Sequence, residues 1–214
     1  MLNNSNKSIY TIMLYKIAHF LRDHFPWIWD LVDLLNSTLF SLRYGSRLKK
    51  VEVAVLAQIL LDKSKTPYRI LPLSEVPSEK LVDFFSHQPE EAYRFFKPHG
   101  FDAKSIHKLQ RNRAFLAYVL MDGSQVAGYC FNRSFFHGKG FRGRQVGIDY
   151  RGRGLGTLMN CLLNEIGFGI GLRLFETVNK DNLASYRSAL SASHVKVLKE
   201  MEGNDLYLEI LNEK

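Results

Sequence analysis

The feature that most constrains this chain is a glycine-rich turn between an apolar stretch and an amphipathic stretch. The turn reads RGRGLG at residues 151–156, and the apolar run before it ends at Tyr150. Apolar residues then recur at helical spacing, at Leu155, Leu158, Met159, Leu162, Leu163 and Ile166. This spacing predicts a strand, a tight turn and a helix, in that order.

Such a turn can direct several backbone N–H groups at one ligand. Glycines at positions 152, 154 and 156 let the backbone turn without Cβ clashes. The helix that follows adds its unpaired N-terminal N–H groups and the positive end of its dipole. Arg151 and Arg153 add positive charge. The pattern predicts a ligand that carries phosphate, and the alternative is a strand-to-helix connection that needs glycine only for its shape.

Two familiar phosphate loops do not match the turn. A nucleoside-triphosphate loop requires a lysine and a Ser or Thr after its last glycine, whereas Thr157 follows Gly156 directly. A dinucleotide-binding loop requires G-x-G-x-x-G in an early strand–helix–strand unit. The spacing here differs and the turn comes late in the chain, which excludes both loops.

The turn resembles the pyrophosphate loop of the GNAT superfamily of N-acetyltransferases, whose pattern is Q/R-x-x-G-x-G/A. Arg151, Gly154 and Gly156 occupy the positions of that pattern, and the preceding Tyr-Arg-Gly entry is also typical of the family. The resemblance continues in LRLFETVNKDNLASYRSAL at residues 172–190, where the family has a strand, an Asn and a short helix. It extends over about residues 67–211 and leaves the N-terminal part of the chain outside.

The resemblance implies an α/β (α+β) fold. Its sheet is mixed and mostly antiparallel, with a central splayed pair of parallel strands, and helices flank it. We expect this GNAT domain at residues 66–214. Residue patterns predict strands at 68–73, 115–121, 125–131, 145–150, 172–178, 194–200 and 205–211, and helices at 76–87, 103–111, 155–166 and 184–191. A long loop around residues 137–140 separates the third strand from the fourth.

Residues 1–65 are predicted to form a helical extension. Two apolar stripes, at residues 9–21 and 31–42, indicate two helices separated near Pro26, and a third apolar stretch covers residues 51–61. The first two segments resemble the helical N-terminus of acetyltransferases from bacterial surface-polysaccharide clusters. Three interpretations stay open: packing on the catalytic domain, a homodimer interface, or contact with a membrane surface. Membrane contact is the least favoured because no dense basic flank accompanies the stripes.

Charge and composition limit the classes of partner. The chain carries a net charge of +8, but its basic residues gather around the turn, with Asp149 the one acidic residue among residues 133–153. No nucleic-acid-binding module is recognisable, so we expect an anionic small ligand and no nucleic acid. Lys139, Arg142 and Arg144 could equally form a solvated basic loop. Two cysteines, no long apolar run and no signal-like N-terminus favour a cytoplasmic protein without a transmembrane segment.

The resemblance implies acetyl-CoA as co-substrate, and we predict no metal. The pantetheine arm is expected along residues 145–148, where the N–H groups of Val146 and Ile148 would also stabilise the oxyanion. The residues that the resemblance assigns to the cofactor are Val146, Gly147, Ile148, Arg151, Gly152, Arg153, Gly154, Leu155, Gly156, Thr157, Asn179, Asn182 and Ser185. No covalent enzyme intermediate is needed, so Cys130 and Cys161 are interpreted as core residues.

Proton transfer is less well defined by the sequence. Tyr186, seven residues after Asn179, matches the family's general acid for the departing thiolate. If Ser193-His194 replaces the family's Gly-Phe, however, the register shifts by three and Ala189 takes that position. The general base is not identified. His99, His137 and Glu176 are the candidates, and the two histidines are also candidate contacts for the acceptor.

These patterns together predict an acetyl-CoA-dependent N-acetyltransferase that transfers acetyl directly to a small amine in a ternary complex. A nucleotide-linked amino sugar is the favoured acceptor. The alternatives are acetylation of a protein lysine or N-terminus, and a binding module that holds acyl-CoA without turnover.

Overall fold

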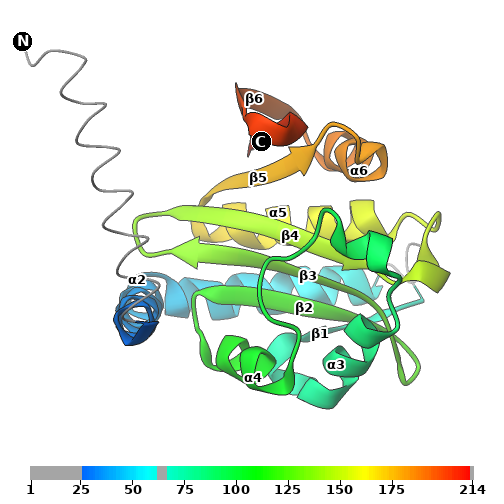
Figure 1. The fold of residues 1–214 in the computed structure, drawn as a ribbon. Helices are drawn as coiled ribbons and strands as arrows, with labels where there is room; N and C mark the ends of the chain where they lie inside the picture. Colours follow the sequence, from blue (N-terminus) through cyan, green and yellow to red (C-terminus); the bar gives the residue numbers. More distant parts are fainter. Residues whose placement is uncertain (1–25, 62–66, 213–214) are drawn as a thin grey trace, which may run out of the picture.

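The computed structural model of the chain describes residues 26–61 and 67–212. A seven-stranded sheet with strand order β1-β2-β3-β4-β5-β7-β6 forms its centre (Figure 1). The strands are β1 (Arg69–Pro72), β2 (Phe115–Asp122), β3 (Gln125–Phe135), β4 (Lys139–Val146), β5 (Arg173–Asn179), β6 (Val195–Glu200) and β7 (Asp205–Ile210). Six of the predicted strands exist with ends that differ by a few residues, whereas the strand predicted at 145–150 shares only residues 145 and 146 with β4.

Helices cover both faces of the sheet. They are α2 (Pro26–Leu61), α3 (Ser78–Ser86), α4 (Ala103–Arg111), α5 (Leu155–Ile170) and α6 (Leu183–Ala192), with short 3-10 turns η1 (Leu73–Glu75), η2 (Glu90–Tyr93), η3 (Ile148–Tyr150) and η4 (Glu202–Asn204). Successive side chains of β2 point to opposite faces. Leu116, Tyr118 and Leu120 share a core with α2 and α5, whereas Ala117 and Val119 share the other core with α3 and α4.

The parallel pair β4–β5 opens along its length. Its three residue pairs are Lys139–Arg173, Gly140–Leu174 and Phe141–Phe175, and all other neighbouring strands are antiparallel. Beyond this short pairing β4 runs on to Val146 and β5 to Asn179 without contact through backbone hydrogen bonds. The expected splayed pair in a mostly antiparallel sheet is confirmed.

Helix α2 differs from the sequence prediction. The predicted second helix and the third apolar stretch form one helix of 36 residues, which begins at Pro26. It continues through Lys49 and Lys50 because its buried stripe is uninterrupted: Phe40, Tyr44, Leu48, Val51 and Val55 recur at helical spacing and pack on the core of α5. The predicted first helix lies outside the described residues.

The segment between β3 and β4 is also corrected. It is a tight hairpin around residues 136–138, and both strands extend into what the sequence suggested was a long loop. Strand β4 ends at Val146, and the residues up to Tyr150 form η3. Residues 139–145 do not show the alternation of apolar and polar residues that indicates a strand, because glycine and arginine occupy positions where a half-buried strand ordinarily carries apolar side chains.

Candidate functional site

A cleft of about 610 Å³ lies where β4 and β5 separate. The C-terminal halves of the two strands form its sides, and the glycine turn with the start of α5 forms one end. Helix α6 closes one wall, while the opposite opening is bordered by Glu91, Phe95 and Phe96 on and after η2. The cleft therefore passes between the strands from the turn toward the η2 side of the sheet.

The glycine turn has the backbone geometry expected of an anion site. Gly152 and Gly154 have φ angles of 76° and 79°, a left-handed conformation that favours glycine. Gly154 is the N-cap of α5, and the first helical hydrogen bond runs from Leu158 N–H to its carbonyl at 3.1 Å. The N–H groups of residues 155–157 precede that bond, so they are available to a ligand in the cleft.

A buried ionic cluster lies at the closed end of the cleft. Arg142 Nε is 2.6 Å from Glu176 Oε2, and Arg144 Nη1 is 3.2 Å from the same oxygen. All three side chains are at most 8% exposed. The interpretation of Arg142 and Arg144 as a solvated basic loop is therefore wrong, because both arginines belong to β4 and point into the protein.

Comparison with solved structures identifies the fold. The GNAT domain of S. lividans PAT matches with a TM-score of 0.58 at 15% sequence identity, over 67% of this chain and 89% of the other. The putative acetyltransferase yncA from Salmonella typhimurium, solved with its cofactor acetyl-CoA, gives 0.53 at 16% identity over 70% and 96%. Aminoglycoside acetyltransferase AAC(6')-Ib, in complex with coenzyme A and kanamycin, gives 0.51 at 11% identity over 67% and 94%.

The chain has the GNAT fold. No protein-family model and no curated protein matches the sequence.

Within this GNAT fold, most of the residues predicted to bind the cofactor line the cleft. They are Val146, Arg151, Gly152, Gly154, Leu155, Gly156, Thr157, Asn179, Asn182 and Ser185. Gly147 and Ile148 instead border a neighbouring hollow beside α3, and the Arg153 guanidinium donates to the Asp149 carbonyl at 2.8 Å and lies over the Tyr150 ring. The residues predicted to bind the cofactor therefore lie in two places, most in the cleft and a few on the outer side of η3.

The backbone of Ile148 is already occupied. Its N–H donates to Gln88 Oε1 at 3.0 Å, and the N–H of Gly147 donates to the Ala127 carbonyl at 2.9 Å. The expectation that Ile148 N–H stabilises an oxyanion is corrected on this ground. Val146, the last residue of β4, keeps its place in the cleft.

Polar side chains of the α6 wall are engaged within the protein. Asn182 Oδ1 accepts from the Ser185 N–H as the cap of α6, and Ser185 Oγ accepts from Arg144 Nη2 at 3.0 Å. Asn179 donates to the Gly203 carbonyl and to Asp205, and accepts from the Asp181 N–H. These predicted pantetheine contacts line the cleft, but their hydrogen bonds hold the wall itself together.

Tyr186 is not brought into the cleft. The residues of α6 that line it include 184, 188 and 191, which share one helical face, whereas Tyr186 lies on the other. Its ring packs against a core formed by Val178, Leu206 and Leu208. The alternative position, Ala189, is fully buried. Neither of the two positions that the sequence pattern allows, 186 or 189, therefore places a tyrosine hydroxyl in the cleft.

His99 lies in an aromatic cluster on the α3 side of the sheet. One ring nitrogen is 2.9 Å from the Tyr129 hydroxyl and the other 2.8 Å from the Gly100 carbonyl, and aromatic rings including Phe85 and Phe131 surround it. Burial lowers its pKa below the ordinary value for histidine. His99 is absent from the lining of the cleft, so its position gives no contact with an acceptor there.

His137 lies at the opposite end of β4 from the glycine turn. Its ring stacks on Phe135 in the β3–β4 hairpin. At about 3.3 Å per strand residue, it is roughly 25 Å from Val146. The structure therefore does not bring His137 to the cleft either.

The two cysteines are in different environments. Cys130 is fully buried on β3, as expected, but Cys161 is exposed on α5, which corrects its interpretation as a core residue. Burial raises the pKa of the Cys130 thiol, and the pKa of Cys161 is also raised, because neighbouring atoms partly desolvate its sulfur although the residue lies at the surface. A raised pKa disfavours the thiolate, so neither cysteine is an activated nucleophile.

The sequence placed Gln145 in the strand expected to hold the pantetheine arm but assigned no role to its side chain. Its side chain is buried and lines the cleft. It alternates with Arg144 along β4, so it belongs to the face of the sheet that carries η2. Only a correct prediction of the bounds of β4 would have shown from the sequence that the Gln145 side chain faces the cleft.

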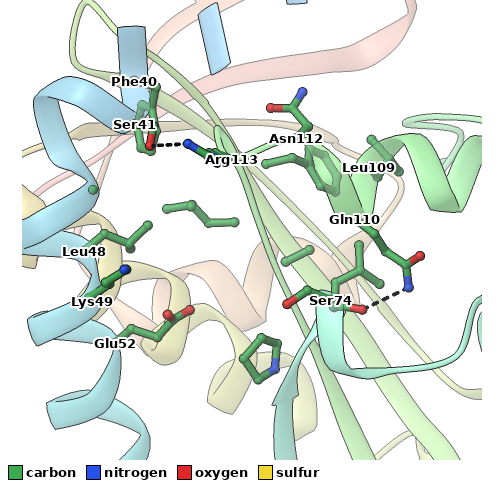
Figure 2. A pocket seen from close by; sticks show the side chains of 16 residues that line it. Phe40, Ser41, Leu48, Lys49, Glu52, Ser74, Leu109, Gln110, Asn112 and Arg113 are labelled. Atoms are coloured by element: carbon green, nitrogen blue, oxygen red, sulfur yellow. Dashed lines mark hydrogen bonds between the residues drawn. The ribbon is translucent and has the colours of Figure 1, made fainter. Parts of the chain in front are cut away.

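A second cavity of about 480 Å³ lies between α2 and the α4 side of the sheet (Figure 2). Glu52 at its edge accepts a hydrogen bond from the buried Tyr118 hydroxyl, and Arg113 donates to Ser41. It is separate from the splayed strands and contains none of the predicted site residues.

Within residues 26–61 and 67–212, no helix is both long and apolar enough to cross a bilayer. In the same part of the chain, His, Cys, Asp and Glu side chains form no group of three that could hold a metal ion.

Proposed function

We propose that this protein is an N-acyltransferase that uses a coenzyme A thioester, acetyl-CoA or a related acyl-CoA, as its co-substrate and a small amine as its acceptor. The observation that carries the proposal is the glycine turn at the mouth of the splayed strands. Its left-handed glycines, unpaired α5 N–H groups and the exposed Arg151 suit a diphosphate. The GNAT-fold structures that contain acetyl-CoA or coenzyme A support the same ligand.

The shape of the cleft suggests how the two substrates meet. With its diphosphate at the turn, the cofactor would extend its arm along β4, between the separated strands. The acceptor would enter on the η2 side, past Phe95 and Phe96, where the Gln145 amide lines the cleft. Holding both substrates in one cleft removes much of the entropic barrier to their reaction.

The reaction is a direct transfer. The amine nitrogen attacks the thioester carbonyl carbon, an N–C bond forms, and the C–S bond breaks. The amine loses one proton, and the departing thiolate of coenzyme A takes one up. The N–H of Val146 is the candidate donor to the transient oxyanion, because it belongs to the strand end that lines the cleft.

The acceptor is proposed to be a small amine, with a nucleotide-linked amino sugar as the first compound class to test. The partly apolar opening at Phe95 and Phe96 favours a small molecule over a folded protein surface. AAC(6')-Ib, solved with coenzyme A and kanamycin, supports a small acceptor for this fold. Acetylation of a peptide lysine or N-terminus is the competing outcome.

The second candidate is a binding module that holds acyl-CoA without turnover. One observation favours it: Tyr186, His99 and His137 all lie outside the cleft. Of the three candidate bases only Glu176 lines the cleft, and its carboxylate is paired with Arg142 and Arg144, so an enzyme with this cleft would rely on substrate positioning and on solvent for its proton transfers.

Calorimetry with coenzyme A and a thiol-release assay separate these candidates. We expect micromolar coenzyme A binding, and thiol release that depends on an amine drawn from a panel of amino sugars, aminoglycosides and peptides. Binding without release for any amine would identify the binding module. No detectable binding of coenzyme A or acetyl-CoA would refute both candidates.

A further inference from the structure

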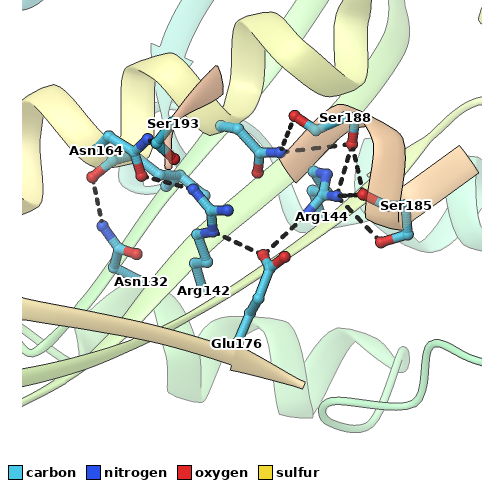
Figure 3. A network of polar contacts seen from close by, with 10 residues as sticks. Asn132, Arg142, Arg144, Asn164, Glu176, Ser185, Ser188 and Ser193 are labelled. Carbon is cyan, nitrogen blue, oxygen red and sulfur yellow. Dashed lines mark hydrogen bonds and ion pairs between the residues drawn. The ribbon is translucent and has the colours of Figure 1, made fainter. Parts of the chain in front are cut away.

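Arg142, Arg144 and Glu176 form a charged cluster at the point where β4 and β5 separate, here called the charged vertex. Figure 3 shows the two arginines approaching Glu176 from opposite sides. Arg142 also donates to Asn164 Oδ1 at 2.6 Å, and Arg144 donates to the Ser185 carbonyl at 2.7 Å and to Ser188 Oγ at 2.6 Å. The other side chains that accept hydrogen bonds from the two arginines, Asn164, Ser185 and Ser188, are neutral.

The charged vertex is unbalanced. Two guanidinium groups face one carboxylate, which leaves one positive charge in excess within the cluster. Arg142 Nη2 is buried and has no hydrogen-bond partner among the described residues, and Glu176 Oε1 is likewise unpaired. Buried charges without full partners are costly, so folded proteins seldom keep them without a functional reason.

The position of the charged vertex connects it with the cleft. Arg142 and Glu176 each follow directly on Phe141 and Phe175, the last paired residues of the two strands, and all three charged residues line the cleft. Val146 is four positions beyond Arg142, a distance of about 13 Å along the strand. A ligand that enters at the glycine turn and follows β4 inward therefore ends at the charged vertex.

We propose that the acyl group carried by this protein's coenzyme A thioester ends in a carboxylate, which the excess guanidinium charge of the charged vertex binds. This proposal depends on the proposed use of a coenzyme A thioester. A methyl group at that place would leave Arg142 Nη2 unpaired, whereas a carboxylate oxygen accepts its hydrogen bond and offsets the extra charge; Glu176 Oε1 gains no donor in either case. The acyl chain would be a short dicarboxylic one, because the strands close behind the cluster.

The experiment compares two acyl-CoAs of equal chain length by calorimetry with the full chain. Succinyl-CoA carries the terminal carboxylate, and butanoyl-CoA replaces it with a methyl group. We expect succinyl-CoA to bind at least about tenfold more tightly, as a charge-assisted hydrogen bond in a buried site does. Equal binding, or tighter binding of butanoyl-CoA, would overturn the proposal.

Coenzyme A without an acyl group separates the failure of this inference from the failure of the proposed function. If coenzyme A binds and the two acyl-CoAs do not differ, only the carboxylate proposal is wrong. If coenzyme A does not bind, the proposed function is wrong and this inference fails with it.

Arg144→Gln and Arg144→Lys form a matched pair of variants. The glutamine removes the excess charge and leaves the Arg142–Glu176 pair balanced, whereas the lysine keeps the charge. We expect the preference for succinyl-CoA to fall below about threefold in Arg144→Gln and to persist in Arg144→Lys. An undiminished preference in folded Arg144→Gln would contradict the role of the charge. If that variant does not fold, the comparison of the two acyl-CoAs in the unchanged protein still decides.

A carboxylate could also arrive on the acceptor. Thiol release from acetyl-CoA is therefore compared between glycine and glycinamide as amines. A preference of about tenfold for glycine, together with no preference among acyl-CoAs, would place the carboxylate on the acceptor and overturn the proposal as stated.

Discussion

Two walls of the same cleft contain the residue types that bind anions and amides, yet only one of them is open to a ligand. At the glycine turn, the α5 N–H groups precede the first helical hydrogen bond, and the Arg151 side chain has no partner among the described residues. On the α6 wall, Asn182, Ser185 and Ser188 are already hydrogen-bonded to the helix or to Arg144. Residue type alone therefore does not identify a binding wall.

The difference lies in what each wall must stabilise. The α6 wall supplies hydrogen-bond acceptors to the buried guanidinium group of Arg144. Burial lowers the pKa of that group, and Glu176 partly restores it. The glycine turn, in contrast, stabilises no buried charge of the protein. Substitutions in the α6 wall and the charged vertex should therefore change stability, in addition to the acyl-group preference proposed for Arg144, whereas substitutions in the glycine turn should mainly change coenzyme A binding.

Glu176→Gln is expected to have the largest effect. It leaves two buried guanidinium groups without a carboxylate, so the free energy of unfolding should fall by about 3–5 kcal/mol. Denaturant unfolding measures this loss. Glu200→Gln breaks an exposed ion pair with Lys180 and should cost less than about 1 kcal/mol. Equal losses of unfolding free energy in the two variants would show that the charged vertex stabilises the fold no more than an exposed ion pair does.

Gly154→Ala is expected to weaken coenzyme A binding by about tenfold or more, because a left-handed alanine strains the turn and tilts its N–H groups. Gly123→Ala is the matched control, since Gly123 also has a positive φ and open space around its Cβ but lies in the β2–β3 turn. Both variants should lose similar stability. Calorimetry in which Gly154→Ala binds coenzyme A normally would exclude the turn as the diphosphate site.

Arg151→Ala should weaken coenzyme A binding by a smaller factor, about two- to fivefold, because an exposed charge acts through solvent. The effect should shrink as salt is raised. Arg153→Ala, whose side chain is held at Asp149 and Tyr150, should change binding less. The reverse order would mean that the ligand passes over the outer side of η3.

Tyr186→Phe should have the smallest effect, less than about a twofold change in kcat, because the ring packs in the core beneath α6. Steady-state thiol release measures it. A drop in kcat of tenfold or more, with KM unchanged, would instead restore the tyrosine to the proton transfer that the sequence pattern predicts for it.

Local patterns made the glycine turn predictable, because three glycines and a helical repeat determine its geometry within a few residues. The existence of β6 and β7 was equally accessible from the Gly203-Asn204 turn between them. The resemblance to the GNAT superfamily supplied the splayed pair, which no periodicity in the sequence indicates.

The features that sequence reasoning missed depend on distant partners. The Ile148 N–H is taken by Gln88, sixty residues earlier in the chain, and the direction of Tyr186 is decided by the core that β7 supplies. The continuity of α2 depends on a stripe that packs against α5, where Gly169 gives Val51 room for close approach. Such contacts have no local signature.

The shortness of the β4–β5 pairing has a mechanical consequence. Three residue pairs join the antiparallel block β1–β4 to the block β5–β7–β6, so we expect the sheet to bend most readily at Phe141 and Phe175. Thermal breathing about that line would widen or narrow the gap between the strands without breaking either block. Amide exchange of β5 and β7 should then vary together and separately from that of β2 and β3, and a molecule wedged in the gap should slow the motion.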